Sequence, residues 1–476
     1  MNTKLLKQKI LDLAIRGKLT QQLKSDGTAK DLLKQISEQK RESSSTLSSP
    51  RRRGSPSAQS EKTIIPLDKS EAPFEIPANW EWVRLGDVAS DFQYGSAEKS
   101  QPEGKIAVLR MGNINRQGQV DYSDLVYTSN DAEIAKYLLN KNDVLFNRTN
   151  SPEWVGKTAI YKGEIPAIYA GYIIRIKPHF NSDYLNYLMC SDYERNWSKE
   201  VKTDGVHQSN INAQKLMAFA VPLPPLAEQQ RIVEKIQEAF AEIDSVENNK
   251  ELLKTHIKQT RQKILDLAIH GKLVPQNKTD EPASVLLERI TRDNPHYEKL
   301  TDIPFEIPDS WEWTSLGVVC EEMQSAKPKG DSFKYIDIDS IDNTICKIKA
   351  PKVIESKNAP SRASRYTKKG DILFSLVRPY LRNIAKVEED NCIASTGFYV
   401  CSPKNINENY CYYLMISHYV VDGLNQYMKG DNSPSISSKN IIEYPIPLPP
   451  LAEQKRIVDR IEEIFASLDE ISLHLV

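Results

Sequence analysis

The hydrophobic and polar positions of this chain form two patterns, long helical stripes and short strand-like runs. Between Pro225 and Gly271, apolar residues recur every three or four positions without glycine or proline, which predicts one helix of about 44 residues, roughly 65 Å long. Pro222, Pro224 and Pro225 mark its start and Gly271 its end. The apolar positions are Leu226, Val233, Ile236, Phe240, Ile243, Val246, Leu253, Ile257, Ile264 and Leu267.

A narrow apolar stripe on so long a helix needs a partner helix. The C-terminal segment has a matching stripe, and the N-terminal segment continues it. These positions are Leu451, Ile457, Val458, Ile461, Ile464, Phe465, Leu468 and Ile471, followed in space by Leu5, Leu6, Ile10, Leu13 and Ala14. We expect an antiparallel coiled coil; the alternative is that each helix packs on its neighbouring domain.

Strand-like runs with glycine and asparagine breaks and one tyrosine-rich helix fill residues 75–221 and 306–446, which predicts two small α+β domains. The two domains share patterns but little identity. The matched segments are Asp143–Phe146 with Asp371–Phe374, Gly171–Ile174 with Gly397–Val400, and Tyr184–Met189 with Tyr410–Met415.

Three motifs occur twice and almost verbatim, which indicates an internal duplication. We call the predicted long helices and the segments that carry these motifs the helical frame. The pairs are Gln8–Leu19 with Gln262–Leu273, Pro73–Trp82 with Pro304–Trp313, and Pro222–Gln229 with Pro447–Gln454. Within the central segment, only residues 252–254 lack a counterpart when the chain ends are joined. We therefore expect a pseudo-twofold molecule with its termini close together; the alternative is a tandem duplication with unrelated termini.

The pattern divides the chain into seven segments. They are residues 1–40 (helical frame), 41–72 (linker), 73–221 (first α+β domain), 222–273 (central helix), 274–303 (linker), 304–446 (second α+β domain) and 447–476 (C-terminal helix). The first linker holds a Ser/Arg-rich insertion at about residues 42–60, typical of a solvated segment. The alternative role for this insertion is a basic arm that touches phosphate.

Composition narrows the function classes. The 476 residues carry a formal net charge of −1, and no apolar run is long enough for a membrane span or a signal peptide, so we expect a cytoplasmic protein. Any DNA-binding surface must come from local clusters of charge. Six cysteines without a C-x-x-C spacing predict free thiols.

Signatures of catalysis are missing from the sequence. It has no GK[ST] phosphate loop, no N-P-P-[FY] or D-P-P-Y methyltransferase box and no H-E-x-x-H motif. His256 and His270 lie on the predicted long helix, where solvated side chains are a better interpretation than metal ligands. We therefore expect no catalytic or metal-binding residue.

Basic and amide side chains are the candidates for DNA contact, because cations meet phosphates and amides meet base edges. Residues 326–386 hold 14 basic and six acidic side chains, a local net charge of +8. In the first domain the candidates lie on three loops; the alternative is ordinary loop structure. The candidates are Arg110, Asn113, Arg116, Arg148, Asn150, Lys157, His207, Gln208 and Asn210, and in the second domain Arg365, Arg378, Arg382, Lys429, Asn432 and Ser435.

The segments PLPPLAEQxRIV, LDLAIxGKL and FEIPxxWEW, each present twice, resemble those of the specificity subunits of Type I restriction–modification systems. The resemblance covers nearly the whole chain and departs from the family mainly at the Ser/Arg insertion. It implies two target-recognition domains that each read half of a split double-stranded DNA target, with the coiled coil setting the spacer. It also implies two methyltransferase and two restriction/translocase partner subunits, which would hold the S-adenosylmethionine, ATP and Mg²⁺.

Two other function classes fit the residues alone. One is a stand-alone regulator that binds a two-part DNA site, and the other is a helical adaptor whose domains bind protein. Co-purification with a methyltransferase subunit would separate the resemblance from both. Loss of DNA retention at high salt would separate the regulator from the adaptor.

Overall fold

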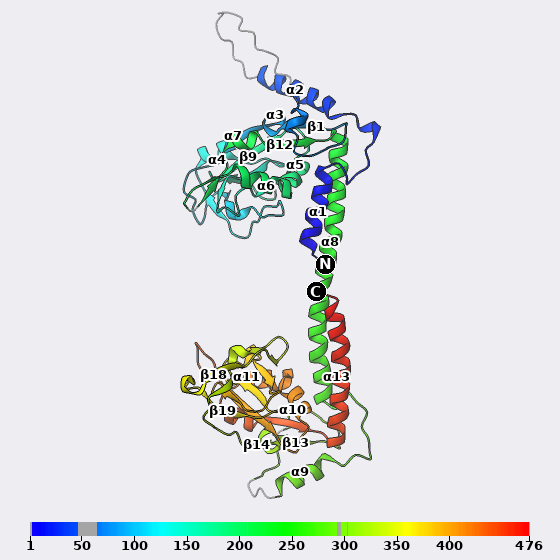
Figure 1. Cartoon of the computed structure of the whole chain (residues 1–476), viewed down its shortest axis with the longest axis vertical. Coiled ribbons are helices and arrows are strands. Elements are labelled where there is room, and N and C mark those ends of the chain that lie inside the picture. The colour runs from blue at the N-terminus through cyan, green and yellow to red at the C-terminus, as the bar shows by residue number, and fades with distance from the viewer. Residues whose placement is uncertain (1, 46–63, 207, 293–296, 302, 476) are drawn as a thin grey trace, which may run out of the picture. The chain divides into compact units, whose positions relative to one another are not determined.

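The structure, a computed structural model, describes residues 2–45, 64–206, 208–292, 297–301 and 303–475 (Figure 1). The chain divides into two compact units, Met1–Asn248 and Asn249–Val476. The division falls within helix α8 (Leu226–Ile269), whose 44 residues confirm the predicted length and bounds of the central helix. Each unit has its own hydrophobic core and its own sheets.

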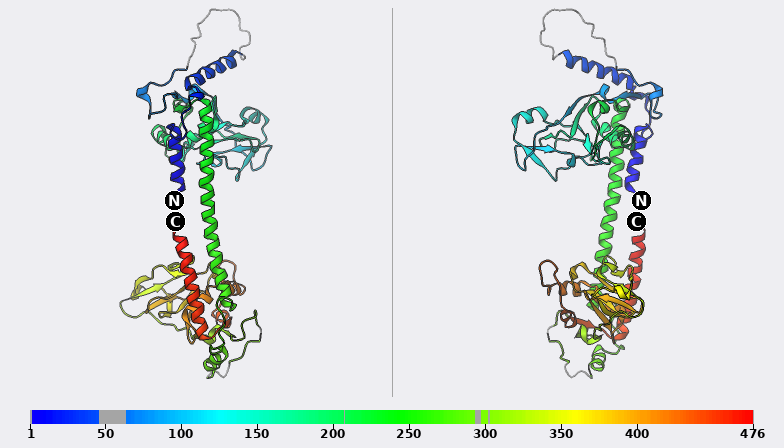
Figure 2. Two further views of the ribbon diagram at one scale, coloured as in Figure 1. Left: turned by 90° about the vertical axis from the view of Figure 1, so that its right-hand side faces the viewer. Right: turned by 60° about the vertical axis from the view of Figure 1, so that its left-hand side comes forward.

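In the first unit, helix α1 (Thr3–Ile15) lies beside the first half of α8, as both views of Figure 2 show. Thr3 donates a hydrogen bond to Glu247, and Lys7 forms an ion pair with Asp244, so the two helices run antiparallel. Their shared apolar contacts belong to one core, with Leu11, Ala14, Ile15, Ile232, Val233 and Ile236. The stripe predicted on α8 is wrong at Leu226, Val246 and Leu253, because these three side chains are exposed.

The first unit's α+β part holds a central antiparallel sheet and two smaller sheets. The central sheet has the order β2 (Ala89–Tyr94), β9 (Ile173–Pro178), β5 (Val144–Asn147), β7 (Thr158–Ile160). The others are β4 (Val126–Thr128), β3 (Ile106–Leu109), β8 (Ala167–Tyr169) and β10 (Thr203–Asp204), β11 (Ser209–Asn210), β6 (Thr149–Asn150). Its helices are α2 (Ala29–Ser45), α3 (Leu85–Val88), α4 (Asp131–Tyr137), α5 (Ser182–Met189), α6 (Asp192–Val201) and α7 (Ala213–Met217).

The second unit repeats the central sheet in the order β14 (Cys320–Glu321), β23 (Phe398–Pro403), β20 (Ile372–Ser375), β21 (Ile384–Lys386). A second sheet follows the order β18 (Lys352–Glu355), β15 (Ser332–Ile336), β22 (Cys392–Ser395), β19 (Ala363–Thr367), beside a hairpin of β16 (Ile341–Asp342) and β17 (Lys347–Ile348). The helices are α9 (Ala283–Thr291), α10 (Glu408–Met415), α11 (His418–Asn425), α12 (Ser438–Ile442) and α13 (Leu451–Leu473).

Helix α13 packs on the second half of α8. Arg261 of α8 forms an ion pair with Asp469, and its guanidinium lies 4.6 Å from the centre of the Phe465 ring. Gln276, just beyond α8, donates to Glu453 near the start of α13, so this pair is also antiparallel. The predicted closeness of the chain ends concerns the placement of one unit against the other and stays a prediction.

In each unit, the tryptophan motif and the PLPPLAEQ motif, which recur almost verbatim, contact each other. Glu228 of the PLPPLAEQ motif is buried and accepts hydrogen bonds from the Trp80 indole (2.8 Å) and the Gln22 amide (2.6 Å). Its counterpart Glu453 accepts from Trp311 (3.0 Å) and Gln276 (2.6 Å). A buried carboxylate requires such donors, so the motifs recur together because they complete one another's hydrogen bonds.

In each unit, the first and last strands of the α+β domain pair in a two-stranded sheet. Strand β1 (Glu81–Arg84) pairs with β12 (Ala220–Leu223), and β13 (Glu312–Ser315) pairs with β24 (Pro445–Leu448), both antiparallel. The tryptophan motif therefore lies against the proline motif that leads into the long helix. This pairing places each domain at a defined point of its helical frame.

Strand pairing corrects one sequence match. Ile173 lies opposite Asn147 and Phe398 lies opposite Ser375, so Phe398 is the counterpart of Ile173 rather than of Tyr172. The first domain carries one extra residue after its glycine. By this register, Val400 stands where the first unit has Arg175, and Cys401 stands where it has Ile176.

Three further expectations concern the cysteines, membrane-spanning helices and the Ser/Arg-rich insertion. All six cysteines are free, as predicted. None of the helices in the described ranges combines the length and apolar character that a membrane crossing requires. Most of the Ser/Arg-rich insertion falls in residues 46–63, outside the described residues, so its predicted role stays open.

Candidate nucleic-acid interface

Two of the loops predicted for the first domain lie together. Strand β6, which follows Arg148, pairs with β11, and the Asn210 amide donates to the Thr149 hydroxyl at 2.8 Å. The backbone carbonyl of Arg148 accepts from the Ile211 amide at 2.9 Å. Strand β6 and the paired strands β10 and β11, far apart in sequence, therefore lie side by side in one small sheet.

Arg148 is the best-placed cation beside this small sheet. It directly follows β5, its guanidinium lies 4.7 Å from the centre of the Tyr94 ring, and its Nε donates to the Gly171 carbonyl at 3.3 Å. Its terminal Nη groups make no hydrogen bond within the described ranges. The Tyr94 ring and the hydrogen bond to the Gly171 carbonyl thus hold the side chain. Its two Nη groups remain available to a ligand.

An open cavity of about 590 Å³ lies in front of Arg148. Arg110 lines it too, although its guanidinium forms an ion pair with Asp124 at 2.9 Å. Lys99 and the half-exposed Tyr172 add a further cation and an aromatic face. The complete lining is Ser96, Ala97, Glu98, Lys99, Ser100, Arg110, Met111, Val126, Arg148, Ala170, Gly171 and Tyr172.

A second aromatic–cation group lies on the Arg110–Arg116 loop. The Arg116 guanidinium lies 4.8 Å from the centre of the exposed Trp154 ring. Lys157 is only 9% exposed and donates to the carbonyls of Met111 (2.9 Å) and Ile114 (2.6 Å). Burial and the nearby Arg116 lower the pKa of Lys157. Lys157 therefore shapes the loop from inside, contrary to the expected DNA contact.

The remaining candidates of the first domain differ in accessibility. Asn113 is buried, and its amide donates to the carbonyls of Asp121 and Asp124 at 2.9 and 2.8 Å, which corrects its expected role as a base reader. Asn150 is half-buried and accepts from the Ser151 amide. Gln208 is exposed at the tip of the β10–β11 turn, and the predicted His207 lies outside the described residues.

The second domain repeats the loop pairing with different side chains. Val377 forms a bridge with Ser435, as Thr149 does with Asn210, and Ser435 in turn pairs with Lys429. The neighbouring Arg378 is exposed, has a left-handed backbone (φ 48°) and donates to the Asn432 carbonyl at 2.9 Å. The predicted Arg378, Lys429, Asn432 and Ser435 are thus brought together.

Two predicted arginines of the second domain lie apart from this group. Arg382 is partly buried and donates to the Ile416 carbonyl, and burial lowers its pKa. It therefore supports α10 and α11 rather than presenting its charge, which corrects the expectation for this residue. Arg365 lies on strand β19 of the second sheet and donates to the Ser325 hydroxyl at 3.5 Å.

Ion pairs neutralise much of the basic window at residues 326–386. Three of its lysines pair with acids outside the window, namely Lys334 with Glu389, Lys368 with Glu321, and Lys386 with Glu408. The local excess of +8 is thereby smaller on the folded surface. Cations of the window without an ion pair in the described ranges are Lys327, Lys329, Lys347, Arg362, Arg365, Lys369, Arg378 and Arg382.

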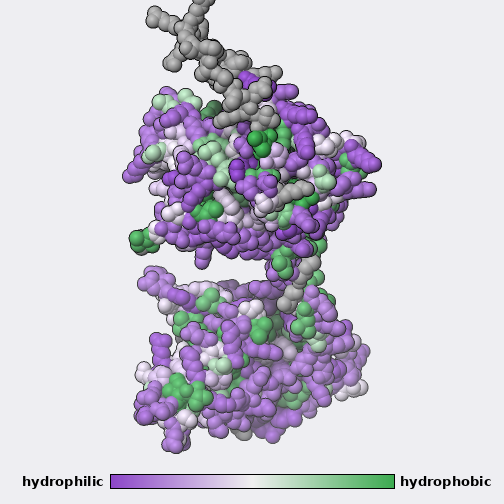
Figure 3. All heavy atoms as spheres, turned by 45° about the horizontal axis from the view of Figure 1, so that its top comes forward, coloured by the Kyte–Doolittle hydropathy of each residue, from purple (hydrophilic) through white to green (hydrophobic). Residues whose placement is uncertain are grey.

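Sequence reasoning missed the exposed aromatic residues beside these cations. Tyr94 and Trp154 support arginines in the first domain, and Tyr380 and Tyr427 are about half exposed near Arg378 and Lys429. Figure 3 shows that hydrophilic residues dominate the visible surface and that hydrophobic residues are scattered among them. The adjacent Arg378-Pro379-Tyr380 was the one local signal of such a pairing.

Comparison with known proteins gives a consistent answer over both units. A model of the Type I restriction modification DNA specificity domain matches residues 77–255 and 308–473. The chain is 23% identical to the Type I restriction enzyme EcoEI specificity subunit of Escherichia coli, over 99% of this chain and 90% of that protein. It is 22% identical to the MjaVIII specificity subunit of Methanocaldococcus jannaschii, over 82% and 87% respectively.

The fold is shared as well. A solved chain from a study of the assembly and conformational transition of the type I R-M system superimposes with a TM-score of 0.55. The two chains are 20% identical, and the match covers 85% of this chain and 94% of that one. The duplicated domains, the shared fold and the family match agree: the chain belongs to the Type I restriction–modification specificity family, as a DNA specificity subunit with two target-recognition domains.

Proposed function

We propose that this subunit reads a split double-stranded DNA target, with one half-site for each recognition domain. The observation that carries the proposal is the repeated loop pairing, Thr149 with Asn210 and Val377 with Ser435. The backbone arrangement is the same in both domains, but Arg148 is replaced by Leu376 and Asn150 by Arg378. Equal scaffolds with different polar groups are suited to two different base sequences.

The contacting groups follow from accessibility. Arg148, with Lys99 and Tyr172 around the cavity, and the Arg116–Trp154 pair would meet DNA in the first domain. Arg378, Lys429, Asn432 and Ser435 would do so in the second. Arginine forks bind phosphate or guanine edges, and exposed rings support them.

The helical frame would set the spacer between the half-sites. Antiparallel contacts of α8 with α1 and with α13 support an extended coiled coil, which resists bending and would keep the half-sites at a fixed separation. We assign none of the cofactors of methylation or DNA cleavage to this subunit. Two methyltransferase and two restriction/translocase subunits would bind the frame and supply S-adenosylmethionine, ATP and Mg²⁺, in keeping with the type I restriction enzymes to which the similar subunits belong.

Methylome sequencing of a host that carries the intact system tests the proposal. We expect adenine methylation at one split motif. Arg148→Ala and Arg378→Ala should each weaken DNA binding by about 1–3 kcal/mol in a titration at fixed salt, and each should relax a different half of the motif. The matched controls are Lys9→Ala and Lys263→Ala, equivalent exposed frame residues that should leave binding unchanged. If both arginine variants bind like the parent, the placement of the interface is wrong.

A further inference from the structure

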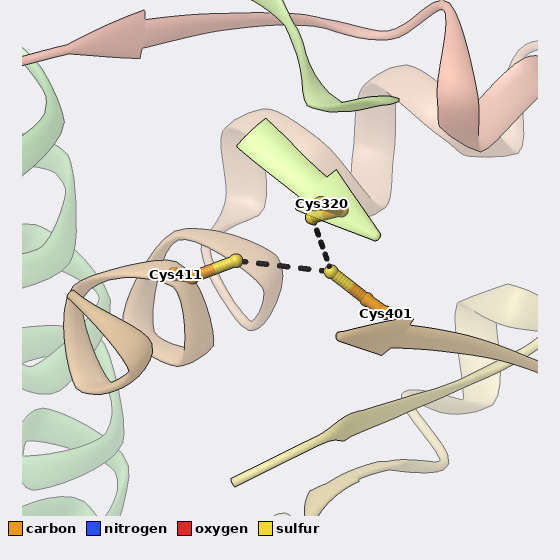
Figure 4. Close-up of side chains that lie close together, drawn as sticks. All are labelled: Cys320, Cys401 and Cys411. Atoms are coloured by element: carbon orange, nitrogen blue, oxygen red, sulfur yellow. Dashed lines mark hydrogen bonds between the residues drawn. The ribbon is translucent and has the colours of Figure 1, made fainter. Parts of the chain in front are cut away.

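Three cysteines converge inside the second unit (Figure 4). Cys320 comes from β14, Cys401 from β23 and Cys411 from α10, and their sulfur atoms all lie within 4.8 Å of one another. The Cys320 and Cys401 sulfurs are 3.0 Å apart, and the Cys401 and Cys411 sulfurs are 3.8 Å apart. Three separate elements therefore place their sulfur atoms at one point of the core.

The first unit has only hydrocarbon side chains at these three positions. The strand register and the repeated helix make Ala89, Ile176 and Leu185 the counterparts of Cys320, Cys401 and Cys411. All three counterparts are buried in the core of the first unit. The shared fold therefore does not require sulfur here, and two large aliphatic side chains have been replaced by smaller thiols.

A neighbouring carboxylate has lost its cation in the second unit. In the first unit, Asp143 lies 4.0 Å from the buried Arg175, whose counterpart in the second unit is Val400. The counterpart of Asp143 is Asp371, which precedes the residue that pairs with Cys401 in the sheet. Asp371 is 1% exposed, and burial raises its pKa. Its Oδ2 accepts a hydrogen bond from the Lys368 backbone amide, whereas its Oδ1 accepts none of ordinary geometry in the described ranges.

We propose that Cys320, Cys401 and Cys411 bind one thiophilic metal ion of the Zn²⁺ class. Zinc bonds to sulfur at about 2.3 Å, so tetrahedral thiolate ligands lie about 3.8 Å apart. The Cys401–Cys411 pair already has that separation, and the Cys320–Cys401 pair has to open by less than about 1 Å to reach it.

Binding replaces three S–H bonds by three S–Zn bonds and releases three protons to solvent. Because the ligands come from two strands of the central sheet and from α10, the ion would tie the sheet of the second unit to the helix that packs on it. The site would therefore stabilise the second recognition domain without touching DNA.

The decisive variant gives the second unit the residues of the first. Cys320→Ala, Cys401→Ile and Cys411→Leu together remove every proposed ligand and supply an apolar core that this fold already uses. Cys346→Ala is the matched control, because it removes a buried cysteine of the same unit outside the cluster. All proteins are purified as the full chain in reducing buffer after growth with zinc.

Elemental analysis should find about one zinc per chain in the parent and in the control, and none in the triple variant. Replacement by Co²⁺ should give a sulfur-to-metal charge-transfer band in the first two proteins only. A chelator should lower the melting temperature of the parent but not of the triple variant. Equal metal content in the parent and triple variant, or no metal in either after Zn²⁺ titration, would overturn the proposal.

A count of reactive thiols distinguishes metal binding from its two alternatives, free thiols and a disulfide. Six thiols without metal would mean that the cysteines only fill space. Four thiols, with a mass lower by two hydrogens in the absence of metal, would mean a disulfide within the cluster. Either result contradicts metal binding, whereas thiols that react only after chelation support it.

Discussion

The two recognition domains share one frame but have different interiors. The frame repeats polar contacts atom for atom, with Glu228 and Glu453 accepting from equivalent tryptophan and glutamine side chains. Inside the domains, the buried Arg175 and Glu194 of the first unit have Val400 and Val420 as counterparts in the second. Polar groups that orient the domains are kept, whereas polar groups inside the domains have changed.

This contrast indicates where sequence variation is tolerated. A motif whose donor and acceptor lie on different segments can change only if both segments change together. An interior ion pair can instead be replaced by apolar residues that pack well, often at no cost in stability. The domain interiors and their loop surfaces could therefore diverge while the frame stayed constant.

The largest effect is expected from breaking the interior ion pairs of the first unit. Arg175→Val copies the second unit at this position but leaves the buried Asp143 without its arginine, while the half-buried Asp91 keeps its ion pair with Lys177. We expect a loss of about 3–5 kcal/mol in unfolding free energy, measured by chemical denaturation of the full chain. Adding Asp143→Asn should recover part of the loss. Equal stability of Arg175→Val and the parent would mean that the two interiors are interchangeable.

A smaller effect, equal in both units, is expected from the frame glycines. Gly17 and Gly271 both have φ +65°, and a Cβ at either would lie 2.3 Å from the ring of Pro77 or Pro308. Gly17→Ala and Gly271→Ala should each cost about 2–4 kcal/mol, from backbone strain and overpacking. Hydrogen exchange should locate each loss in its own unit.

Gly112→Ala is the control for the glycine pair, because no atom lies within 4 Å of the position of its Cβ. This variant should change stability by about 0.5 kcal/mol or less. A large difference between Gly17→Ala and Gly271→Ala would contradict the equivalence of the two frames.

The effect that is smallest between neighbouring measurements is the pH dependence due to Glu194, which the second unit lacks at the equivalent position. Burial raises the pKa of Glu194 from 4.5 to about 8, and Val420 cannot titrate at this position in the second unit. Between these two pH values the folded carboxyl keeps a proton that the unfolded chain releases. Stability should therefore fall as pH rises, by at most about 1.4 kcal/mol per pH unit.

Urea denaturation across this pH window should detect the slope, and Glu194→Gln should reduce it. Burial also raises the pKa of Asp143, Asp371 and Glu453, so part of the slope should remain. Glu194→Val, which copies the second unit, should reduce the slope by the same amount. An unchanged slope in Glu194→Gln would assign the pH dependence to the other carboxyls.

Sequence reasoning was strongest where structure is local or repeated. The bounds of α8 follow from helical periodicity between Pro225 and Gly271, and the doubled motifs identified the frame and the family. Loops were also located well as segments, because turn residues and cations cluster there. The individual contacts were less predictable, because the sequence around a lysine such as Lys157 does not distinguish a buried side chain from a solvated one.

The sequence by itself therefore determined the duplicated frame, the length of its central helix and the two-domain organisation. Only the tertiary structure decided that β6 pairs with the distant β11, and that Asn113 and Lys157 are buried. Tertiary structure alone also brought Cys320 together with Cys401 and Cys411. The physical reason is that helix periodicity depends on neighbours within a few residues, whereas burial and side-chain convergence depend on pairing between strands distant in the chain.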